Sequence, residues 1–164
     1  MPSRKASQTS TARYLVDTCV FVHAFCDGAN GPSDIVEASR QLFARAEAGS
    51  IHVHVSAVTI AEVLAINYLR DDDPRRRTEE REKLKTWLAS RTTAVEVDQS
   101  LALAAGEAGH QYQLKGADAI IYASAIEAGV DALITTDKGL LKADSHAMPV
   151  LAPTRIGGQD IISI

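Results

Sequence analysis

The sequence has few cysteines, few aromatic residues and no long apolar run. Two of its 164 residues are cysteine, and aromatic side chains make up 5%. Cys19 and Cys26 are seven residues apart on one short apolar segment, which favours two reduced thiols over a disulfide. No apolar stretch approaches the roughly 20 residues that span a bilayer. These absences argue against a disulfide-rich or membrane-spanning protein and predict a cytoplasmic one.

The N-terminal segment lacks the apolar core of a signal peptide. Residues 1–12 are rich in serine and threonine and carry Arg4 and Lys5, which predicts a disordered tail. Residues 13–164 are long enough for one domain that buries roughly 70% of its unfolded surface. Apolar residues at 46% and charged residues at 23% are ordinary for a globular protein.

An excess of positive charge, the usual mark of a nucleic-acid-binding protein, is also missing. The formal net charge is −4 and the pI is about 5.7, which argues against a nucleic-acid partner. The objection weakens if four carboxylates hold divalent metal ions, because the rest of the chain is then neutral. Net charge governs solubility and long-range attraction, and it leaves room for a local basic patch.

Short β-branched runs alternate with helical patterns along the chain. Strands are predicted at 14–16, 51–55, 94–97, 132–135 and 150–152, and helices at 18–26, 34–48, 58–69, 75–90, 99–111 and 117–128. Ser33 and Ser56 are the expected caps of two of these helices. The alternation predicts an α/β fold with a parallel sheet covered on both faces. Residues 71–77 (DDDPRRR) are interpreted as an irregular, solvated connection of mixed charge.

Two acidic residues follow strands of the predicted sheet. Asp17 comes directly after the first strand, and Asp137 follows the fourth. In a five-stranded sheet of order 3-2-1-4-5 these strands are neighbours at the point where the strand order reverses. Ligands bind at that point in open α/β sheets. Each acid also has a structural alternative as the N-cap of the next helix.

Two further acids lie in helical segments that are otherwise apolar. Glu62 is flanked by alanine, valine, leucine and isoleucine, and its structural alternative is a capping box with Thr59. Asp118 begins a strongly apolar helix, where the helix dipole alone favours an acid. Each of the four acids has a structural explanation of its own. Four of them at one edge of one sheet indicate a shared role.

A cluster of carboxylates predicts a bound cation. Two carboxylates about 4 Å apart repel each other by roughly 4 kcal/mol at an effective dielectric near 20. Oxygen ligands of this kind suit Mg²⁺ or Mn²⁺, whereas histidine and cysteine would indicate zinc. Such ions lower the pKa of a bound water and stabilise charge on a phosphoryl oxygen.

The order and local sequence of these acids resemble those of the PIN-domain nucleases. The resemblance spans residues 13 to 153 and is strongest to the VapC-type toxins of toxin–antitoxin pairs. It rests on four motifs: Val16-Asp17-Thr18, Ala61-Glu62, Lys115-x-x-Asp118-Ala119 and Thr135-Thr136-Asp137. The resemblance implies that Asp17, Glu62, Asp118 and Asp137 are the catalytic and metal-binding residues, with Thr135 in support.

The resemblance also implies an activity and partners. The expected protein is a Mg²⁺- or Mn²⁺-dependent endoribonuclease that uses a metal-activated water and leaves a 3′-hydroxyl and a 5′-phosphate. Its expected partners are RNA, a cognate antitoxin and a second copy of the chain, without a membrane. One position departs from the family pattern, because Cys19 stands where the family often has asparagine. A supporting amide is therefore expected to be missing there.

Several other residues have both a functional and a structural interpretation. Lys115 could contact a phosphate near the metal or be an ordinary exposed lysine, and Arg13 and Lys138 are weaker candidates for the same contact. His52 and His54 share one face of a strand and could bind zinc, although an exposed edge strand explains them better. The arginines at 75–77 have RNA contact as the less favoured interpretation, and packing is the expected role of Tyr122 and Ser124.

Two other functions remain open at the level of sequence. A phosphoacceptor receiver domain is also a small doubly wound fold, and Asp98 is its only available acceptor on a central strand. A non-catalytic PIN scaffold that binds RNA or protein is the second alternative. It should have lost part of the acidic quartet, and all four acids are present here.

Overall fold

The computed structural model describes residues 11–25, 31–65 and 73–156. The elements in chain order are β1 (Ala12–Val16), α1 (Thr18–Phe25), α2 (Ser33–Glu47), β2 (Ile51–Ser56), α3 (Ala57–Ala65), α4 (Pro74–Arg91), β3 (Thr92–Val95), α5 (Gln99–Tyr112), α6 (Gly116–Ala128), β4 (Ala132–Ile134), α7 (Lys138–Leu141), β5 (Val150–Leu151) and the 3-10 helix η2 (Pro153–Arg155). Cys26 and the greater part of the predicted tail lie outside the described residues, and β1 begins one residue before the predicted domain boundary.

The five strands form one parallel sheet with β1 at its centre. The strand order is β3-β2-β1-β4-β5, and every neighbouring pair is parallel. The predicted order 3-2-1-4-5 is therefore confirmed. Because β1 pairs with both β2 and β4, the strand order reverses at the end of β1.

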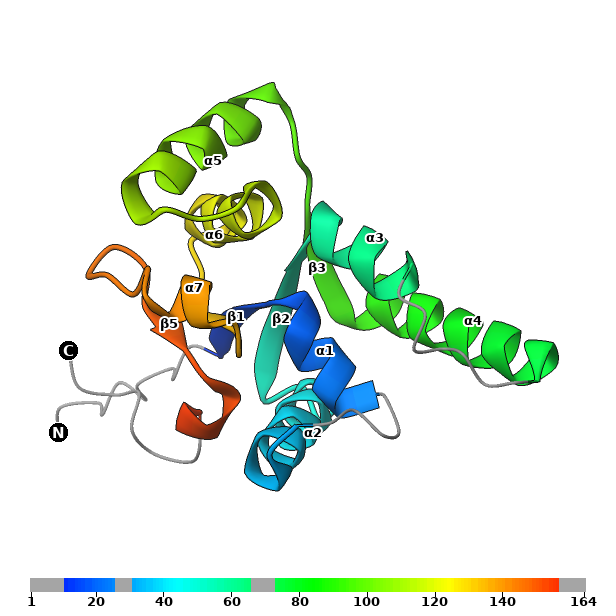
Figure 1. Cartoon of the computed structure of the whole chain (residues 1–164). Coiled ribbons are helices and arrows are strands. Elements are labelled where there is room, and N and C mark those ends of the chain that lie inside the picture. Colours follow the sequence, from blue (N-terminus) through cyan, green and yellow to red (C-terminus); the bar gives the residue numbers. More distant parts are fainter. Residues whose placement is uncertain (1–10, 26–30, 66–72, 157–164) are drawn as a thin grey trace, which may run out of the picture.

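Helices cover both faces of the sheet, as Figure 1 shows. Tyr14 and Val16 of β1 point into a core formed with α1, α2, α3 and α4. Leu15 points to the opposite face, where it packs with residues of α5, α6 and α7. This alternation is the period of a strand that is buried on both sides. Among the described helices, none is long and apolar enough to cross a membrane.

The structure corrects the predicted boundaries of α4 and β3. Helix α4 begins at Pro74, and the Asp73 carboxylate accepts the N–H of Arg75 at 2.9 Å as its cap. The arginines at 75–77 thus form the first helical turn, because proline is favoured at that position. The interpretation of this part of residues 71–77 as irregular was wrong. Strand β3 starts two residues earlier than predicted, because α4 runs directly into it at Thr92.

One of the two predicted helix caps is confirmed. The hydroxyl of Ser56 accepts the N–H of Val58 at 3.3 Å at the start of α3. Ser33 is instead the first residue of α2, and Pro32 occupies the cap position without a side-chain hydrogen bond. The prediction of Ser33 as a cap was wrong, because the rigid proline already sets the backbone for helix entry.

Candidate functional site

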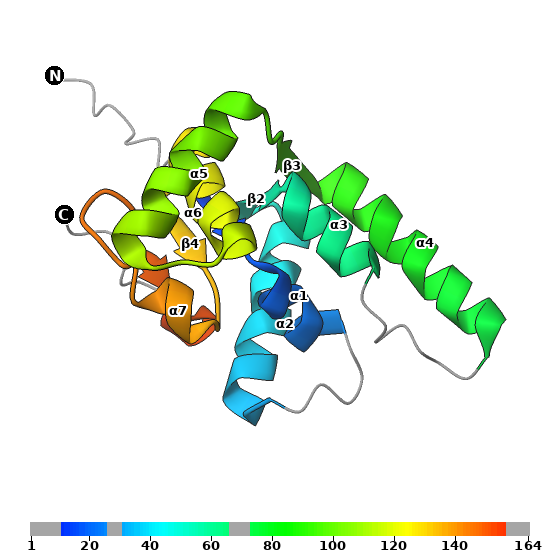
Figure 2. The same ribbon diagram turned by 45° about the horizontal axis from the view of Figure 1, so that its top comes forward.

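Side chains of four elements interact beyond the C-terminal end of β1. The carboxyl group of Asp118 has a raised pKa, caused first by burial and then by the negative charges of Asp137, Asp17 and Glu62. The four predicted acids are therefore close enough to influence one another electrostatically. In Figure 2, α1, α3, α6 and α7 are grouped around the end of β1. The topology brings together residues that are up to 120 positions apart in the sequence.

Asp17 is buried and held by three hydrogen-bond donors. Its side chain is 5% exposed. Oδ1 accepts the N–H of Thr18 at 2.6 Å, and Oδ2 accepts the hydroxyl of Thr135 at 2.6 Å and the thiol of Cys19 at 3.0 Å. Burial raises the pKa of Asp17, while these three hydrogen bonds act in the opposite direction. The carboxylate is thereby fixed in one orientation at the strand end.

Cys19 stands where a supporting amide was expected to be missing, and its thiol supplies a hydrogen bond to Asp17. Burial and the nearby charge of Asp17 raise the pKa of its thiol to about 11, so the sulfur keeps its proton at neutral pH and donates it to Asp17. The sulfur also accepts the N–H of Thr136 at 3.2 Å. The amide that the resembling family often has is absent, as expected, and a thiol supports Asp17 in its place.

Thr135 links the ends of β1 and β4. Its side chain is fully buried. Its hydroxyl donates to Oδ2 of Asp17 and accepts the N–H of Asp137 at 2.9 Å. One hydroxyl therefore sets the position of two of the predicted acids.

Asp137 is exposed and caps a helix. Its Oδ1 accepts the N–H groups of Gly139 at 2.7 Å and Leu140 at 2.9 Å at the start of α7. The structural alternative for Asp137, the N-cap of the next helix, is therefore confirmed. Capping occupies one carboxylate oxygen, so a second role would fall to Oδ2.

Glu62 lies in the interior of α3, and its carboxylate is directed toward α1. Its Oε2 accepts the hydroxyl of Thr18 at 2.5 Å, which connects it to the residue that follows Asp17. Thr59 lies inside the same helix rather than at its cap. The capping-box alternative for Glu62 was therefore wrong.

Asp118 and Lys115 stand at the start of α6. Asp118 is half-buried in the first turn, and Lys115 is the exposed residue at the N-cap position. The lysine charge lowers the pKa of Asp118, opposing burial and the other acids. Lys115 makes no side-chain cap hydrogen bond. Its ammonium group thus places a positive charge near Asp118 at the start of α6.

The donor set suits a hard divalent cation, although its present arrangement is not a closed coordination shell. Within residues 11–25, 31–65 and 73–156, no three histidine, cysteine, aspartate or glutamate side chains are placed so that they could hold a metal ion. Asp17, Glu62 and Asp137 all accept hydrogen bonds from protein donors instead. Four carboxylates nevertheless provide the oxygen ligands that Mg²⁺ and Mn²⁺ prefer. A cation would be bound after the side chains of the half-buried Glu62 and Asp118 and the exposed Asp137 had turned toward it.

Of the remaining candidate residues, Arg13 and the two histidines make no recorded contact with the four acids, whereas Lys138 adjoins one of them. Arg13 donates to the carbonyl of Gly129 at the opposite end of α6 from Asp118. His52 is exposed, and His54 has a lowered pKa, caused mainly by burial. No group of three ligating side chains in the described ranges includes either histidine, so the zinc alternative lacks a site. Lys138 is exposed in the first turn of α7, next to Asp137.

Tyr122 and Ser124 have packing roles within α6. The Tyr122 hydroxyl is 3.1 Å from that of Ser145. The Ser124 hydroxyl donates to the Ile120 carbonyl at 2.8 Å and lies 3.1 Å from the Ser56 hydroxyl, within hydrogen-bond distance. Both side chains are buried, and these bonds satisfy their polar atoms as a structural role requires.

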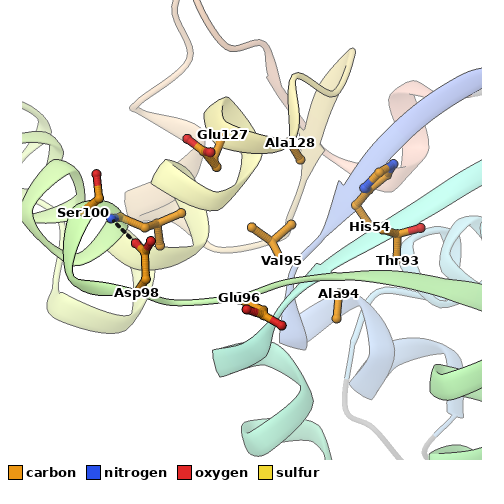
Figure 3. A pocket seen from close by; sticks show the side chains of 10 residues that line it. His54, Thr93, Ala94, Val95, Glu96, Asp98, Ser100, Glu127 and Ala128 are labelled. Atoms are coloured by element: carbon orange, nitrogen blue, oxygen red, sulfur yellow. Dashed lines mark hydrogen bonds between the residues drawn. The ribbon is translucent and has the colours of Figure 1, made fainter.

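A surface hollow of about 440 Å³ lies along β3, and none of the four site acids lines it. Figure 3 shows His54, Glu96, Asp98 and Glu127 around it. Asp98 caps α5 there, accepting the N–H of Leu101 at 2.8 Å. In a receiver-type sheet of order 2-1-3-4-5 the third strand would be central, whereas β3 is at the edge of this sheet. The receiver alternative was wrong.

Comparisons with known proteins give a family and a fold. A family model described as "PIN domain" matches residues 14–145. A solved structure of FitAB bound to an IR36 DNA fragment has a chain with 18% identity and a TM-score of 0.65, covering 90% of this chain and 99% of that one. A toxin–antitoxin complex from Klebsiella pneumoniae matches with 21% identity and a TM-score of 0.59, covering 85% and 97%. VapBC2 from Rickettsia felis, bound to a promoter DNA fragment, matches with 16% identity and a TM-score of 0.58, covering 85% and 98%. A search of curated proteins finds no match.

Proposed function

The chain belongs to the PIN domain family, and we propose that it is a Mg²⁺- or Mn²⁺-dependent endoribonuclease. PIN domains of this kind include nucleases, which hydrolyse phosphodiester bonds in nucleic acids. The observation that carries the proposal is the placement of four acids around the end of β1: Thr135 joins Asp17 to the backbone of Asp137, Glu62 accepts the hydroxyl of Thr18, and Asp118 lies near enough for their charges to raise its pKa. Four interacting acids at the reversal point of the sheet destabilise one another, and a divalent cation would relieve that repulsion.

In this proposal each acid has a distinct role. Asp17, Asp118 and Asp137 would hold the cation, and Glu62 would complete the site or orient the attacking water. Thr135 and Cys19 would keep the Asp17 carboxylate aimed at the cation through the hydrogen bonds described above. A bound Mg²⁺ or Mn²⁺ would supply an acidified water and stabilise the charge that develops on the phosphate.

Lys115 would assist on the substrate side of the acids. Its exposed ammonium is close enough to Asp118 to lower that residue's pKa, so a phosphate bound near Asp118 would also be near this cation. Lysine contacts phosphate as a point charge without strict geometry. The proposed contact therefore adds affinity and leaves base selection to other residues.

We further propose that the protein is the toxin of a toxin–antitoxin pair and acts as a homodimer in the cytoplasm. The similar solved structures include toxin–antitoxin complexes, which supports an antitoxin partner. Leu103 of α5 is 68% exposed and Ile126 of α6 is 49% exposed, so these helices offer apolar surface to a second copy. Rescue of growth by a short neighbouring reading frame would test the pairing, and light scattering of Leu103→Glu against the natural chain would test the dimer.

RNA cleavage by the purified protein tests the nuclease proposal. We expect Mg²⁺- or Mn²⁺-dependent cleavage that EDTA abolishes and that Asp118→Asn reduces more than a hundredfold. Glu127→Gln is the matched control, because Glu127 is an exposed acid at the other end of the same helix. Cleavage that survives both EDTA and Asp118→Asn would show that the acids are not the active site.

The same experiment separates the catalytic protein from a non-catalytic scaffold. A scaffold would bind RNA with equal affinity in the natural chain and in Asp118→Asn, without metal-dependent turnover in either. One observation favours this second function: among the described residues, no three ligating side chains are placed to hold a metal ion. Turnover that depends on both the metal and Asp118 would exclude it.

A further inference from the structure

Helix α4 carries positive charge that the rest of the chain lacks. Its 18 residues contain seven of the chain's 17 lysines and arginines and three of its 21 acids. The helix therefore has a net charge of +4, and all other residues together have a net charge of −8. An excess of positive charge on one helix is typical of a surface that binds a negatively charged partner.

The N-terminal half of α4 is a solvent-exposed arm. The buried residues of the helix are Leu84 and Leu88, both in its second half. Between residues 74 and 83, every residue except Arg77 is exposed. Figure 1 shows this half of α4 projecting from the body of the protein. Packing against the core therefore does not explain the sequence of this segment.

The helix dipole does not favour the basic residues at the start of α4 either. The first turn contains the arginines at 75–77 and no acidic residue, although the helix dipole disfavours cations at that end. Further along the helix, Lys83 pairs with Glu80 at 2.7 Å and Lys85 with Glu82 at 3.5 Å. The three arginines lie at the end of the helix where the dipole disfavours cations.

A direct contact joins the arm to the element that carries Glu62. The Nε of Arg81 donates to the carbonyl of Leu64 at 3.3 Å, so α4 runs along the end of α3 just beyond Glu62. A nucleic-acid strand that lies over the acids and continues past α3 would therefore meet the first turns of α4.

We propose that the first turn of α4, residues 75–77, binds the phosphate backbone of the single-stranded RNA that is cut at the acids. This inference rests on the proposed nuclease function. The rest of the chain has a net charge of −8 and repels RNA, and a basic arm that extends from the end of α3 supplies attraction without reading bases. Arginine suits this role because its guanidinium binds phosphate oxygens through two parallel hydrogen bonds.

Binding of RNA in the absence of cleavage tests the arm. The probe is a fluorescein-labelled 20-nucleotide oligouridylate, and its anisotropy is followed in EDTA across a range of salt concentrations. Arg75→Gln/Arg76→Gln/Arg77→Gln should weaken binding at low salt roughly tenfold or more. A plot of the logarithm of the association constant against the logarithm of the salt concentration has a negative slope. The triple variant should make this slope shallower by about 2, since each lost phosphate contact removes roughly 0.7 for a single strand.

Two further variants distinguish a phosphate contact from a general effect of charge or folding. Lys83→Gln/Lys85→Gln/Arg91→Gln removes the same charge from later turns of α4 and should change the slope by less than half as much. Arg75→Lys/Arg76→Lys/Arg77→Lys keeps the charge and should retain most of the affinity. The glutamine triple at 75–77 should melt no lower than the natural chain, because it removes cations from a helix N-terminus.

Equal slopes for the two glutamine triples, or no RNA binding by the natural chain, would overturn the proposal. So would a triple at 75–77 that binds RNA normally but no longer self-associates, because the arm would then serve a second copy of the chain. These results are independent of the nuclease test. If the natural chain cleaves RNA and the glutamine triple at 75–77 leaves the salt slope unchanged, only the proposed RNA contact of α4 is refuted. If the triple alters the slope but the natural chain shows no metal-dependent cleavage, only the proposed nuclease activity is refuted.

Discussion

The ends of β1 and β4 share a sequence pattern but build different local structures. Each strand is apolar, leads to an aspartate and continues into a helix. Asp17 is buried and accepts three hydrogen bonds, whereas Asp137 is exposed and caps α7 with one oxygen. The number of residues after the strand explains the difference. Asp17 follows β1 immediately, while two threonines separate Asp137 from β4.

The comparison shows how one hydroxyl can couple two acids with different exposure. Thr135 is buried and faces the end of the neighbouring strand, so its oxygen meets both Asp17 and the backbone of Asp137. Asp17 is rigid because it has three partners, and Asp137 keeps one oxygen available. In the proposed metal site Asp17 would be a rigid ligand and Asp137 an adaptable one, so the site could hold a cation while substrate enters and product leaves.

The largest effect should come from removing the charge of either acid. Asp17→Asn should reduce RNA cleavage by more than the roughly 10–100-fold that follows the loss of a metal site's outer partner. Asp137→Asn should reduce it less, because one Asp137 oxygen is already committed to the helix cap and asparagine also caps helices. Cleavage rates at saturating Mn²⁺ measure both variants. A larger loss in Asp137→Asn than in Asp17→Asn would reverse the proposed ranking.

Thr135→Val should remove the hydrogen bonds that connect Asp17, after β1, with Asp137, after β4. Valine keeps the shape but removes the donor to Asp17 and the acceptor for the Asp137 N–H. We expect a loss of about 1–3 kcal/mol of stability from the unpaired groups and a cleavage rate roughly 10–100-fold lower. Thr135→Ser keeps the hydroxyl and should recover most of the cleavage rate. Chemical denaturation and cleavage assays measure the two effects, and equal activity of the valine and serine variants would show that the hydroxyl has no part in the site.

Much of this arrangement could be predicted from the sequence because it depends on local pattern. The alternation of strands and helices predicted the parallel sheet. The order 3-2-1-4-5, expected for a PIN-like fold, made the strands before Asp17 and Asp137 neighbours. The helix predicted over 75–90 matches α4 to within one residue at each end, but residues 71–77 were also interpreted as irregular, because three aspartates and three arginines look like a solvated loop. The signal was present in Pro74, which is favoured in the first turn of a helix.

The hydrogen bonds around Asp17 could not be predicted in the same way. They join residues 17, 19 and 135, and only the paired strands bring these together. In the sequence Cys19 looked like the loss of a supporting amide, because cysteine is a weak donor in general. Burial beside an acid makes it a fully protonated donor, which is a property of the folded surroundings rather than of the residue type.

Cys19 should make a smaller contribution than Thr135 to the rigidity of Asp17. Cys19→Ala removes the thiol donor and leaves the Thr136 N–H without its sulfur acceptor, so we expect the Mn²⁺ concentration for half-maximal cleavage to rise roughly 3–10-fold. Cys19→Ser should restore the natural value, because a hydroxyl both donates and accepts. Binding of Mn²⁺ followed by calorimetry gives a readout apart from activity. A serine variant as impaired as the alanine variant would mean that the sulfur acts by packing alone.

The smallest effect concerns stability and its dependence on pH. Burial and the neighbouring acids raise the pKa of Asp118 above its ordinary value of 3.8. An acid that binds its proton more tightly in the folded state destabilises the fold at every pH above that raised pKa. The destabilisation disappears as the pH falls through the raised pKa toward 3.8. In EDTA, Asp118→Asn should therefore melt roughly 1–3 °C higher than the natural chain at pH 7.5.

The same advantage should be smaller at pH 4, because the raised pKa of Asp118 leaves less negative charge there in the natural chain, and Glu127→Gln should show no such trend. Circular dichroism melts at the two pH values measure it. Added Mg²⁺ should stabilise the natural chain more than the variant, because the cation relieves the repulsion that the substitution has already removed. A variant that melts lower at pH 7.5, or whose gain is undiminished at pH 4, would show that the negative charge of Asp118 does not destabilise this end of the sheet.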